Sequence, residues 1–276
     1  MMEQNDPSGI RLVAMDMDGT LLNDRKELPK DFIPWVRRHP EVLKVIASGR
    51  QYYQLLRDLA PLGDELIYIA ENGGIVFENG EQIYCNAMAE EDQRLALSAV
   101  RHAQEQLPEL TLSPILCGAG SAWLRKDASE EAKRNAALYY ARLGEAEDLF
   151  SLVGTDSILK IAVFVSNRRA KEAYAAFGPI SERLNAVVSG DSWIDIANDD
   201  EDKGLAVEAI CRRHGLRREQ CMAFGDYMND SGLLQSCGES YCMENGLEEL
   251  KRLARYVAPS NNEEGVMQVL KARIGE

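Results

Sequence analysis

The sequence predicts an α/β fold: a mainly parallel, Rossmann-like sheet with a second α/β lobe inserted into it. Short apolar or β-branched runs alternate with longer amphipathic stretches along the 276 residues, a pattern typical of βα units. Hydrophobic residues make up 45% of the chain, enough for a full core, and this length suits about two domains. The alternation is plainest towards the two ends of the chain.

The first third of the chain carries a series of strands and helices followed by a hairpin. We predict strands at 10–15, 42–47 and 66–70, and helices at 29–39 and 51–60. Two further apolar runs, 73–77 and 81–84, flank Asn79-Gly80, a dipeptide that favours a tight hairpin turn.

The middle of the chain has enough strands and helices for a lobe of its own. Its predicted helices are 90–106, 129–143 and 168–177, and its predicted strands are 111–116, 121–124, 158–165, 186–189 and 192–196. The last third returns to plain alternation, with helices at 203–214, 229–235, 247–253 and 263–272 and strands at 221–224, 240–243 and 256–258. We therefore predict a core of residues 1–84 and 191–276, interrupted by an inserted lobe of residues 85–190.

The charge balance argues against two classes of partner. Forty-five acidic residues against 31 basic ones give a net charge of −14, whereas proteins that bind nucleic acid or anionic membranes need basic surface. No run approaches the roughly 18–20 apolar residues of a membrane span. The polar residues 1–9 do not resemble a secretory signal. We predict a cytoplasmic enzyme or binding protein, with no prediction of its oligomeric state.

The cysteines and histidines form no recognisable metal or disulfide pattern. The six cysteines contain no C-x-x-C pair, and the three histidines are scattered along the chain. In a chain without an export signal, this distribution predicts reduced and mostly buried thiols.

A first acidic motif, Asp16-Met17-Asp18-Gly19-Thr20, follows the strand predicted at 10–15. Ligands of open α/β sheets bind beyond the carboxyl ends of the strands, and two carboxylates beside a tight glycine turn suit one small pocket. A solvated turn is the alternative. A calcium-binding EF-hand loop is excluded, because its glycine is the sixth residue whereas Gly19 is the fourth residue of this motif.

A second acidic motif, Gly225-Asp226-Tyr227-Met228-Asn229-Asp230, follows the strand predicted at 221–224. Alone, it is also explained by an aspartate that caps the next helix. If both strands are parallel, Asp16 and Asp226 lie at the same sheet edge, where their like charges repel unless a cation binds them. Oxygen ligands with room left for water favour Mg²⁺ as that cation.

Two more strand or helix ends carry groups suited to phosphate. Ser48-Gly49-Arg50 follows the strand at 42–47 and opens a helix, where backbone N–H groups favour anions, although an ordinary serine cap is the alternative. Lys203 opens the helix at 203–214, where a cation opposes the helix dipole and needs a reason. The acidic run 199–202 before it fits either helix capping or a solvated surface.

These four segments, in this order, resemble the haloacid dehalogenase superfamily of phosphotransferases. The large insert between the second and third segments resembles the Cof-type branch of that superfamily. The resemblance extends from Asp16 to Glu263-Glu264-Gly265-Val266, and Asn72-Gly73-Gly74 and 261–266 resemble two further stretches common in the branch. The run 199–202 is more acidic than the branch usually shows at this place.

The resemblance implies a Mg²⁺-dependent phosphatase that works through an aspartyl-phosphate. It implies that Asp16 is the nucleophile, that Asp18 is the general acid and base, and that Mg²⁺ binds the Asp16 carboxylate, the Asp18 backbone carbonyl and the Asp226 carboxylate. The implied phosphate contacts are Thr20, Ser48, Gly49, Lys203 and Asn229. Asp230 is implied to orient Lys203 or to support the metal shell. Asn72 is a candidate substrate contact, and Arg50 contacts substrate or pairs with local acids.

The implied substrate is a small phosphate monoester, such as a sugar phosphate or a related phosphometabolite. The insert is implied to act as a cap that closes over the site and selects the leaving group. Asp18 favours phosphate chemistry over dehalogenation, because a halide leaves without a proton. Two alternatives remain: a phosphomutase of the same fold, and a non-catalytic Mg²⁺-dependent protein that binds phosphometabolites. Release of free phosphate distinguishes these three functions.

Overall fold

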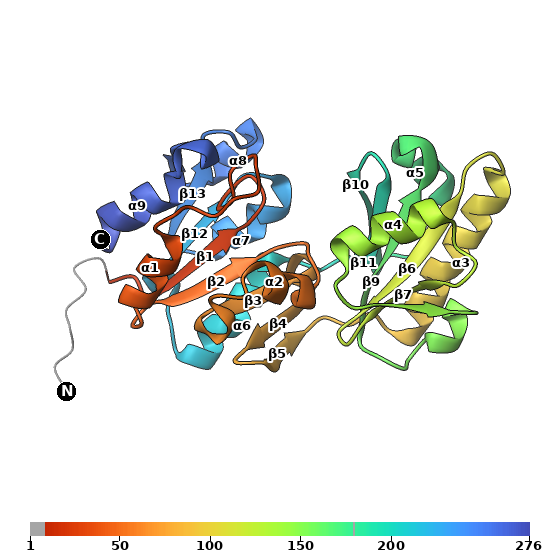
Figure 1. Ribbon diagram of the computed structural model, residues 1–276, viewed down its shortest axis with the longest axis horizontal. Coiled ribbons are helices and arrows are strands. Elements are labelled where there is room, and N and C mark those ends of the chain that lie inside the picture. The colour runs from red at the N-terminus through yellow and green to blue at the C-terminus, as the bar shows by residue number, and fades with distance from the viewer. Residues whose placement is uncertain (1–8, 179) are drawn as a thin grey trace. The chain divides into compact units, whose positions relative to one another are not determined.

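The chain folds into two compact α/β units (Figure 1). The computed structural model describes residues 9–178 and 180–276. The first unit combines the chain up to Gly49 with Leu59–Tyr84 and Asp202–Glu276, and the second combines Arg50–Asp58 with Cys85–Glu201. Each unit has its own sheet, and the predicted fold class is confirmed.

The first unit is built on an eight-stranded sheet. Its strands, in spatial order, are β14 (Tyr256–Ala258), β13 (Glu239–Met243), β12 (Cys221–Gly225), β1 (Leu12–Asp16), β2 (Leu43–Ala47), β3 (Ile67–Ala70), β4 (Ile75–Glu78) and β5 (Glu81–Cys85). The strands from β14 to β3 are parallel, and β4 returns antiparallel to β3. Every residue of β1 is buried, as expected for a parallel strand covered on both faces.

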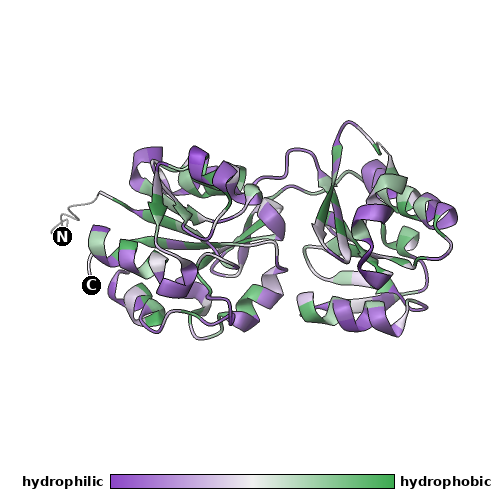
Figure 2. Cartoon of the chain, turned by 90° about the horizontal axis from the view of Figure 1, so that it is seen from above, coloured by the Kyte–Doolittle hydropathy of each residue, from purple (hydrophilic) through white to green (hydrophobic). Residues whose placement is uncertain are grey.

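Helices lie on both sides of this sheet, with apolar residues concentrated on the strands and on the inner faces of the helices (Figure 2). They are α1 (Phe32–Arg38), α6 (Lys203–His214), α7 (Ser231–Ser236), α8 (Glu248–Leu253) and α9 (Gly265–Arg273). Helices α6, α7 and α8 share one buried cluster with the sheet, in which Leu12 and Ile210 are fully buried. The Trp35 indole of α1 donates a hydrogen bond to the Gly275 carbonyl, beyond α9 (3.0 Å).

The second unit has a six-stranded, mostly antiparallel sheet. Its strands, in spatial order, are β10 (Leu184–Gly190), β11 (Trp193–Asn198), β9 (Ile158–Val165), β6 (Leu112–Gly118), β7 (Ala122–Arg125) and β8 (Leu143–Ala146). Its helices are α2 (Tyr52–Asp58), α3 (Glu90–Gln106), α4 (Glu130–Tyr139) and α5 (Ala170–Phe177). Helices α3 and α5 pack on one sheet face, and α4 packs on the other.

Short 3-10 helices connect several of these elements. They are η1 (Gly63–Glu65), η2 (Glu71–Gly73), η3 (Leu149–Leu152), η4 (Ser166–Arg168), η5 (Arg218–Gln220), η6 (Met228–Asp230) and η7 (Asn261–Glu263). Helix α2 groups with the second unit, and the Gln51 side chain just before it exchanges two hydrogen bonds with the Arg142 backbone (2.9 and 3.0 Å). The Arg142 guanidinium also lies over the Tyr53 ring, 3.5 Å from its centroid.

Two sequence predictions are corrected by the strand pairing. The second unit extends to Glu201 rather than ending at residue 190, because β11 lies between β10 and β9 in its sheet, and it also takes in Arg50–Asp58 from the predicted core. The helix predicted at 129–143 ends at Tyr139, and the residues from Leu143 onwards form β8, which pairs in parallel with β7. In both places the apolar pattern is compatible with either assignment, and only the pairing partner decides between them.

Two further observations concern membranes and thiols. Among the residues that the structure describes, no helix combines the length and apolarity needed to cross a membrane. Residues 1–8, which carry most of the prediction of no secretory signal, lie outside the described ranges. All six cysteines are free thiols, and Cys117, Cys221, Cys237 and Cys242 are buried.

Candidate active site

Three neighbouring strands of the first unit bring the predicted motifs to one edge of the sheet. Asp16 is the last residue of β1, Ser48 follows β2, and Asp226 follows β12. Strands β12 and β2 both pair in parallel with β1, so the carboxyl ends of all three lie at the same edge. Because each of these residues lies at the carboxyl end of a buried parallel strand, their side chains share one site.

A buried ion cluster forms the floor of this site. The Lys203 Nζ donates hydrogen bonds to Asp16 Oδ1 and to Asp230 Oδ1, each at 2.7 Å. The side chains of Lys203 and Asp230 are 0% and 1% exposed. The second oxygen of Asp230, Oδ2, accepts from the backbone N–H groups of Asp226 and Tyr227 (3.0 and 3.2 Å). Asp230 therefore fixes both the lysine and the loop that carries Asp226.

The start of α6 explains how the lysine reaches this position. The Asp202 side chain caps α6 by accepting from the N–H groups of Gly204 and Leu205. Helix capping and a solvated surface were the two roles left open for residues 199–202, and Asp202 has the capping role. Burial disfavours the Lys203 ammonium, but the carboxylates of Asp16 and Asp230 outweigh burial and hold its pKa above the usual value. Two buried carboxylates are thus the reason for a cation at a helix N-terminus.

The carboxylates of the site form a donor set suited to a hard divalent cation. One oxygen from each of Asp16, Asp226 and Asp230 lies within 4.8 Å of the others. Burial, together with repulsion from the neighbouring carboxylates, raises the pKa of Asp16 to about 8 and that of Asp226 to about 6. Lys203 alone therefore does not balance the negative charge. Oxygen donors with a deficit of positive charge fit Mg²⁺.

Gly19 and Thr20 shape the wall beside Asp226. Gly19 has a φ of +84°, and a Cβ at this position would lie 2.4 Å from Asp226 Oδ2. The Thr20 hydroxyl donates to Asp226 Oδ1 at 3.0 Å. The turn after β1 therefore needs a glycine for two reasons, its backbone conformation and the close approach of a carboxylate.

Replacing Gly19 with alanine is expected to weaken Mg²⁺ binding at least about tenfold, because the new methyl group displaces the Asp226 carboxylate. The positive φ of residue 19 is strained for alanine, so we also expect the protein to be destabilised by about 1–2 kcal/mol. Calorimetric titration with Mg²⁺ and thermal unfolding measure the two effects. Gly80→Ala is the matched control, since Gly80 has a φ of +75° and a methyl group there would meet no atom within 4 Å. Equal Mg²⁺ affinity in the two variants would contradict this account.

Four predicted phosphate or substrate contacts lie together next to this cluster. Asn229 Nδ2 donates to Asn72 Oδ1 at 3.1 Å, and a Cβ on Gly49 would lie 2.9 Å from the same oxygen. The Asn72 N–H donates to the Ser48 carbonyl (3.0 Å). Asn72 itself, in η2, has a φ of +57°. The turns after β2, β3 and β12 are thereby joined through Asn72.

The two remaining predicted residues lie in different surroundings. Asp18 is half-exposed, its Oδ1 accepts from Lys26 Nζ at 2.7 Å, and its charge contributes to the raised pKa of Asp226. Arg50 forms an ion pair with Asp58 (2.6 Å). Of the two roles predicted for Arg50, pairing with a local acid is the one that the structure contains. Direct contact of Thr20, Ser48, Lys203 and the other predicted groups with a phosphate stays a prediction.

Two residues at the site were missed in the sequence. Asn245 Nδ2 donates to the Gly19 carbonyl at 2.7 Å, and its Oδ1 accepts from the Asn261 N–H at 2.9 Å. Asn245 follows β13, so its position after a parallel strand was a usable signal. Lys26, the partner of Asp18, has no comparable signal, because it lies in a polar loop between a motif and a helix.

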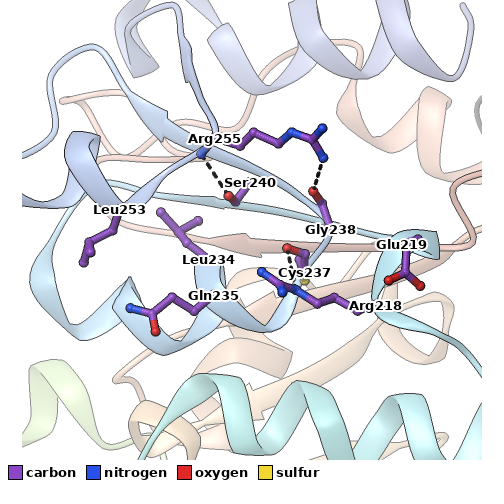
Figure 3. Close-up of a pocket in the computed structure, with 9 residues that line it drawn as sticks. All are labelled: Arg218, Glu219, Leu234, Gln235, Cys237, Gly238, Ser240, Leu253 and Arg255. Atoms are coloured by element: carbon purple, nitrogen blue, oxygen red, sulfur yellow. Dashed lines mark hydrogen bonds between the residues drawn. The ribbon is translucent and has the colours of Figure 1, made fainter.

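A separate pocket of about 300 Å³ lies near the amino ends of three strands of the same sheet. Figure 3 shows the side chains that line it. Its lining includes Gly238 and Arg255, which directly precede β13 and β14, and Arg218, which lies shortly before β12. The guanidinium groups donate to backbone carbonyls, Arg218 to Cys237 and Arg255 to Gly238 (Figure 3). This pocket contains none of the predicted site residues, and it is distinct from the carboxylate cluster.

Comparison with known proteins identifies the family of this chain. The family described as haloacid dehalogenase-like hydrolase matches residues 13–270. The chain belongs to this family. As a haloacid dehalogenase-like hydrolase of the Cof-type branch, it has the fold and family that its sequence motifs predicted.

Several relatives of this hydrolase are similar over nearly their whole length. The 5-amino-6-(5-phospho-D-ribitylamino)uracil phosphatase YbjI of Escherichia coli is 29% identical over 265 residues, which cover 95% of each chain. Phosphatase YwpJ of Bacillus subtilis is 23% identical over 282 residues, covering 95% of this chain and 99% of its own. The crystal structure of TM0651 from Thermotoga maritima superposes with a TM-score of 0.83 at 24% identity, covering 95% and 97%. The predicted enzyme class, a phosphatase of this family, is confirmed.

Proposed function

We propose that this hydrolase is a Mg²⁺-dependent phosphatase that cleaves a small phosphate monoester through an aspartyl-phosphate on Asp16. The observation that carries the proposal is the buried cluster in which Lys203 binds Asp16 and Asp230 beside Asp226. A cluster of this kind holds one carboxylate oxygen in place at the edge of the sheet. The names of the relatives support phosphate ester hydrolysis as the reaction.

In the first step, Asp16 attacks phosphorus. Lys203 occupies Asp16 Oδ1, and no hydrogen bond from the described part of the chain reaches Oδ2, so Oδ2 is the oxygen available for attack. A bond forms between Oδ2 and phosphorus, and the ester P–O bond breaks. Asp18 gives its proton to the leaving oxygen, which departs as an alcohol.

In the second step, water hydrolyses the aspartyl-phosphate. The Asp18 carboxylate, now deprotonated, accepts a proton from a water molecule whose oxygen attacks phosphorus. The bond between phosphorus and Asp16 Oδ2 breaks, which returns the Asp16 carboxylate and frees inorganic phosphate. Asp16 carries the phosphoryl group from the first step to the second, and Asp18 gives a proton in the first step and accepts one in the second.

The other residues of the site are proposed to hold the charges in place. Asp16, the Asp18 backbone carbonyl and Asp226 would hold Mg²⁺, with Asp230 supporting the arrangement through Lys203; when bound, Mg²⁺ neutralises charge between a carboxylate and a phosphate. The proposed contacts to oxygens of the transferring phosphoryl group are Thr20, Ser48, the Gly49 N–H, Lys203 and Asn229. Asn72, which bonds to Asn229 and Ser48, is proposed to contact the substrate.

The substrate is proposed to be a sugar phosphate or a related phosphometabolite. The relative from Escherichia coli is named for a substrate with a phosphorylated ribityl group, which belongs to this chemical class. The second unit is proposed as the cap that selects the leaving group, as its position within the chain between the motifs suggests. A cytoplasmic location and a lack of nucleic-acid partners stay predictions from the sequence.

The test is release of free phosphate from p-nitrophenyl phosphate and from a panel of sugar phosphates, with and without EDTA. Mg²⁺-dependent release supports the proposal, and the fastest panel member identifies the leaving group. Bisphosphate-dependent isomerisation with little free phosphate would instead identify the phosphomutase. Tight binding of panel members without turnover would identify the non-catalytic binding protein.

The affinity for Mg²⁺ is expected to fall as the pH decreases. Burial raises the pKa of the Asp16 and Asp226 carboxyl groups, and Mg²⁺ binds only their carboxylate forms, so protons compete with the cation as the pH falls. The dissociation constant for Mg²⁺ should therefore rise as the pH is lowered from about 8 to about 6, by up to about tenfold per pH unit for each proton that binding releases. Calorimetry in buffers of different ionisation enthalpy counts the protons, and an affinity that stays constant over this range would contradict the charge balance described above.

A further inference from the structure

The loop after the first motif places a lysine on the carboxylate proposed as acid and base. Lys26 Nζ donates to Asp18 Oδ1 at 2.7 Å, across eight residues of sequence. We propose that Lys26 is a positioning residue, which holds the Asp18 carboxyl group in the orientation needed to protonate the leaving group. This inference rests on the proposed function, since it assigns a role to a residue that acts through Asp18.

A tight turn determines where Lys26 lies. Lys26 N–H donates to the Asn23 carbonyl (2.9 Å), and Asn23 N–H donates to the Glu27 carbonyl (3.2 Å), which closes a small hairpin-like loop. The Asn23 side-chain oxygen accepts from the N–H groups of Arg25 and Glu27 (2.9 and 3.0 Å). Lys26 occupies the left-handed position of this turn, with a φ of +62°. Loops of this kind usually have glycine there.

The loop is also anchored to a distant part of the chain. Asp24 and Asn262 exchange two hydrogen bonds, one from the Asp24 N–H and one from Asn262 Nδ2 (3.1 and 2.9 Å). Asn261, buried in η7, donates to the Leu22 carbonyl at 3.0 Å. These contacts anchor the start of the turn on both sides of Asn23, so the fold as well as the lysine itself directs the ammonium of Lys26 at Asp18.

Stability does not explain a lysine at this position. The side chains of Lys26 and Asp18 are 60% and 40% exposed, and exposed ion pairs contribute little to stability. A glycine would adopt the same φ without strain. Lysine adds an ammonium group within hydrogen-bond distance of the Asp18 carboxylate. The chain has a net charge of −14, and the nearby Asp226 carboxylate repels that of Asp18. Orientation of Asp18 is the effect that accounts for this residue.

Lys26→Gly removes the ammonium and keeps the turn. Protonation of the leaving group matters little for p-nitrophenolate, which leaves readily, and much for an alkoxide. We expect the variant to hydrolyse the alkyl phosphate that wild type cleaves fastest about 10- to 100-fold more slowly, with p-nitrophenyl phosphate changed less than about threefold. Lys26→Arg is expected to restore most of the alkyl phosphate rate, and thermal unfolding of Lys26→Gly should match or exceed that of wild type.

Arg25→Ala is the matched control, because Arg25 lies in the same loop and pairs with Glu27 (3.0 Å) instead of Asp18. It should leave both rates unchanged. Equal losses on both substrates in Lys26→Gly, or no loss on either, would overturn the positioning role while the proposed function stood. A wild-type enzyme inactive on every substrate would overturn the proposed function itself, and the inference with it.

Discussion

Asp16→Asn is expected to reduce phosphate release by roughly 10,000-fold or more, the size of effect seen when a nucleophile of a catalytic unit is removed. The amide has the size and shape of the carboxyl group, but it carries no nucleophilic oxygen for phosphorus. Lys203 keeps its second partner, Asp230, at 2.7 Å. The ion cluster therefore loses one carboxylate without leaving the ammonium alone.

Activity and stability of this variant are expected to separate. Burial and the neighbouring carboxylates raise the pKa of Asp16, so replacing it relieves repulsion, and the thermal midpoint should stay equal or increase. Phosphate release and thermal unfolding in EDTA provide the two readouts. Asp31→Asn is the control, because Asp31 pairs with Lys271 on the surface (2.6 Å). Turnover by Asp16→Asn at the wild-type rate would disprove the covalent route.

Lys203→Met is expected to abolish activity and to lower the free energy of unfolding by about 3–5 kcal/mol, because removal of one partner leaves buried carboxylates without their counterion. Lys203 is fully buried between Asp16 and Asp230. Saturating Mg²⁺ should recover part of the lost stability, since a divalent cation at the cluster replaces some of the missing positive charge. Urea unfolding with EDTA and with Mg²⁺ measures both quantities.

A second substitution distinguishes charge imbalance from lost packing. Asp230→Asn in the Lys203→Met background removes one of the unbalanced carboxylates, so we expect stability to rise again while activity stays absent. Lys271→Met is the control, because Lys271 is partly exposed and pairs with the exposed Asp31, and it should change stability by about 1 kcal/mol or less. A Lys203→Met protein as stable as wild type in EDTA would show that the buried pairs do not stabilise this fold.

The grouping of the candidate site residues was predictable, because several of them lie at strand ends. Asp16, Ser48 and Asp226 each follow an apolar run that reads as a buried parallel strand, and parallel neighbours place their carboxyl ends together. Lys203 was predictable for a related reason, since a cation at a helix start is unfavourable without carboxylates nearby. In these cases, the apolar run shows where a strand ends, and the rules of parallel sheets show that residues at neighbouring strand ends lie together.

Contacts between turns were not predictable in this way. Asn72 and Asn229 are 157 positions apart, and whether their amides meet depends on the conformations of two turns, including the left-handed φ of Asn72. The pairing of Lys26 with Asp18 depends on a turn anchored by Asn262 from the other end of the chain. A sequence pattern records burial and periodicity, and it does not record which polar side chains meet in space.

The sequence by itself determined the α/β class, the strands that carry Asp16 and Asp226, and the existence of an inserted lobe, because hydrophobic periodicity and helix-end chemistry are local. Only the tertiary structure decided that β11 belongs to the sheet of the second unit and that 143–146 forms a strand rather than the end of a helix. It also decided that Lys203 binds both Asp16 and Asp230. The pattern of apolar and polar residues in a strand is the same whichever of the two sheets it joins, so pairing and packing decide which sheet contains it. Packing likewise decides which charged side chains, distant in sequence, meet in space.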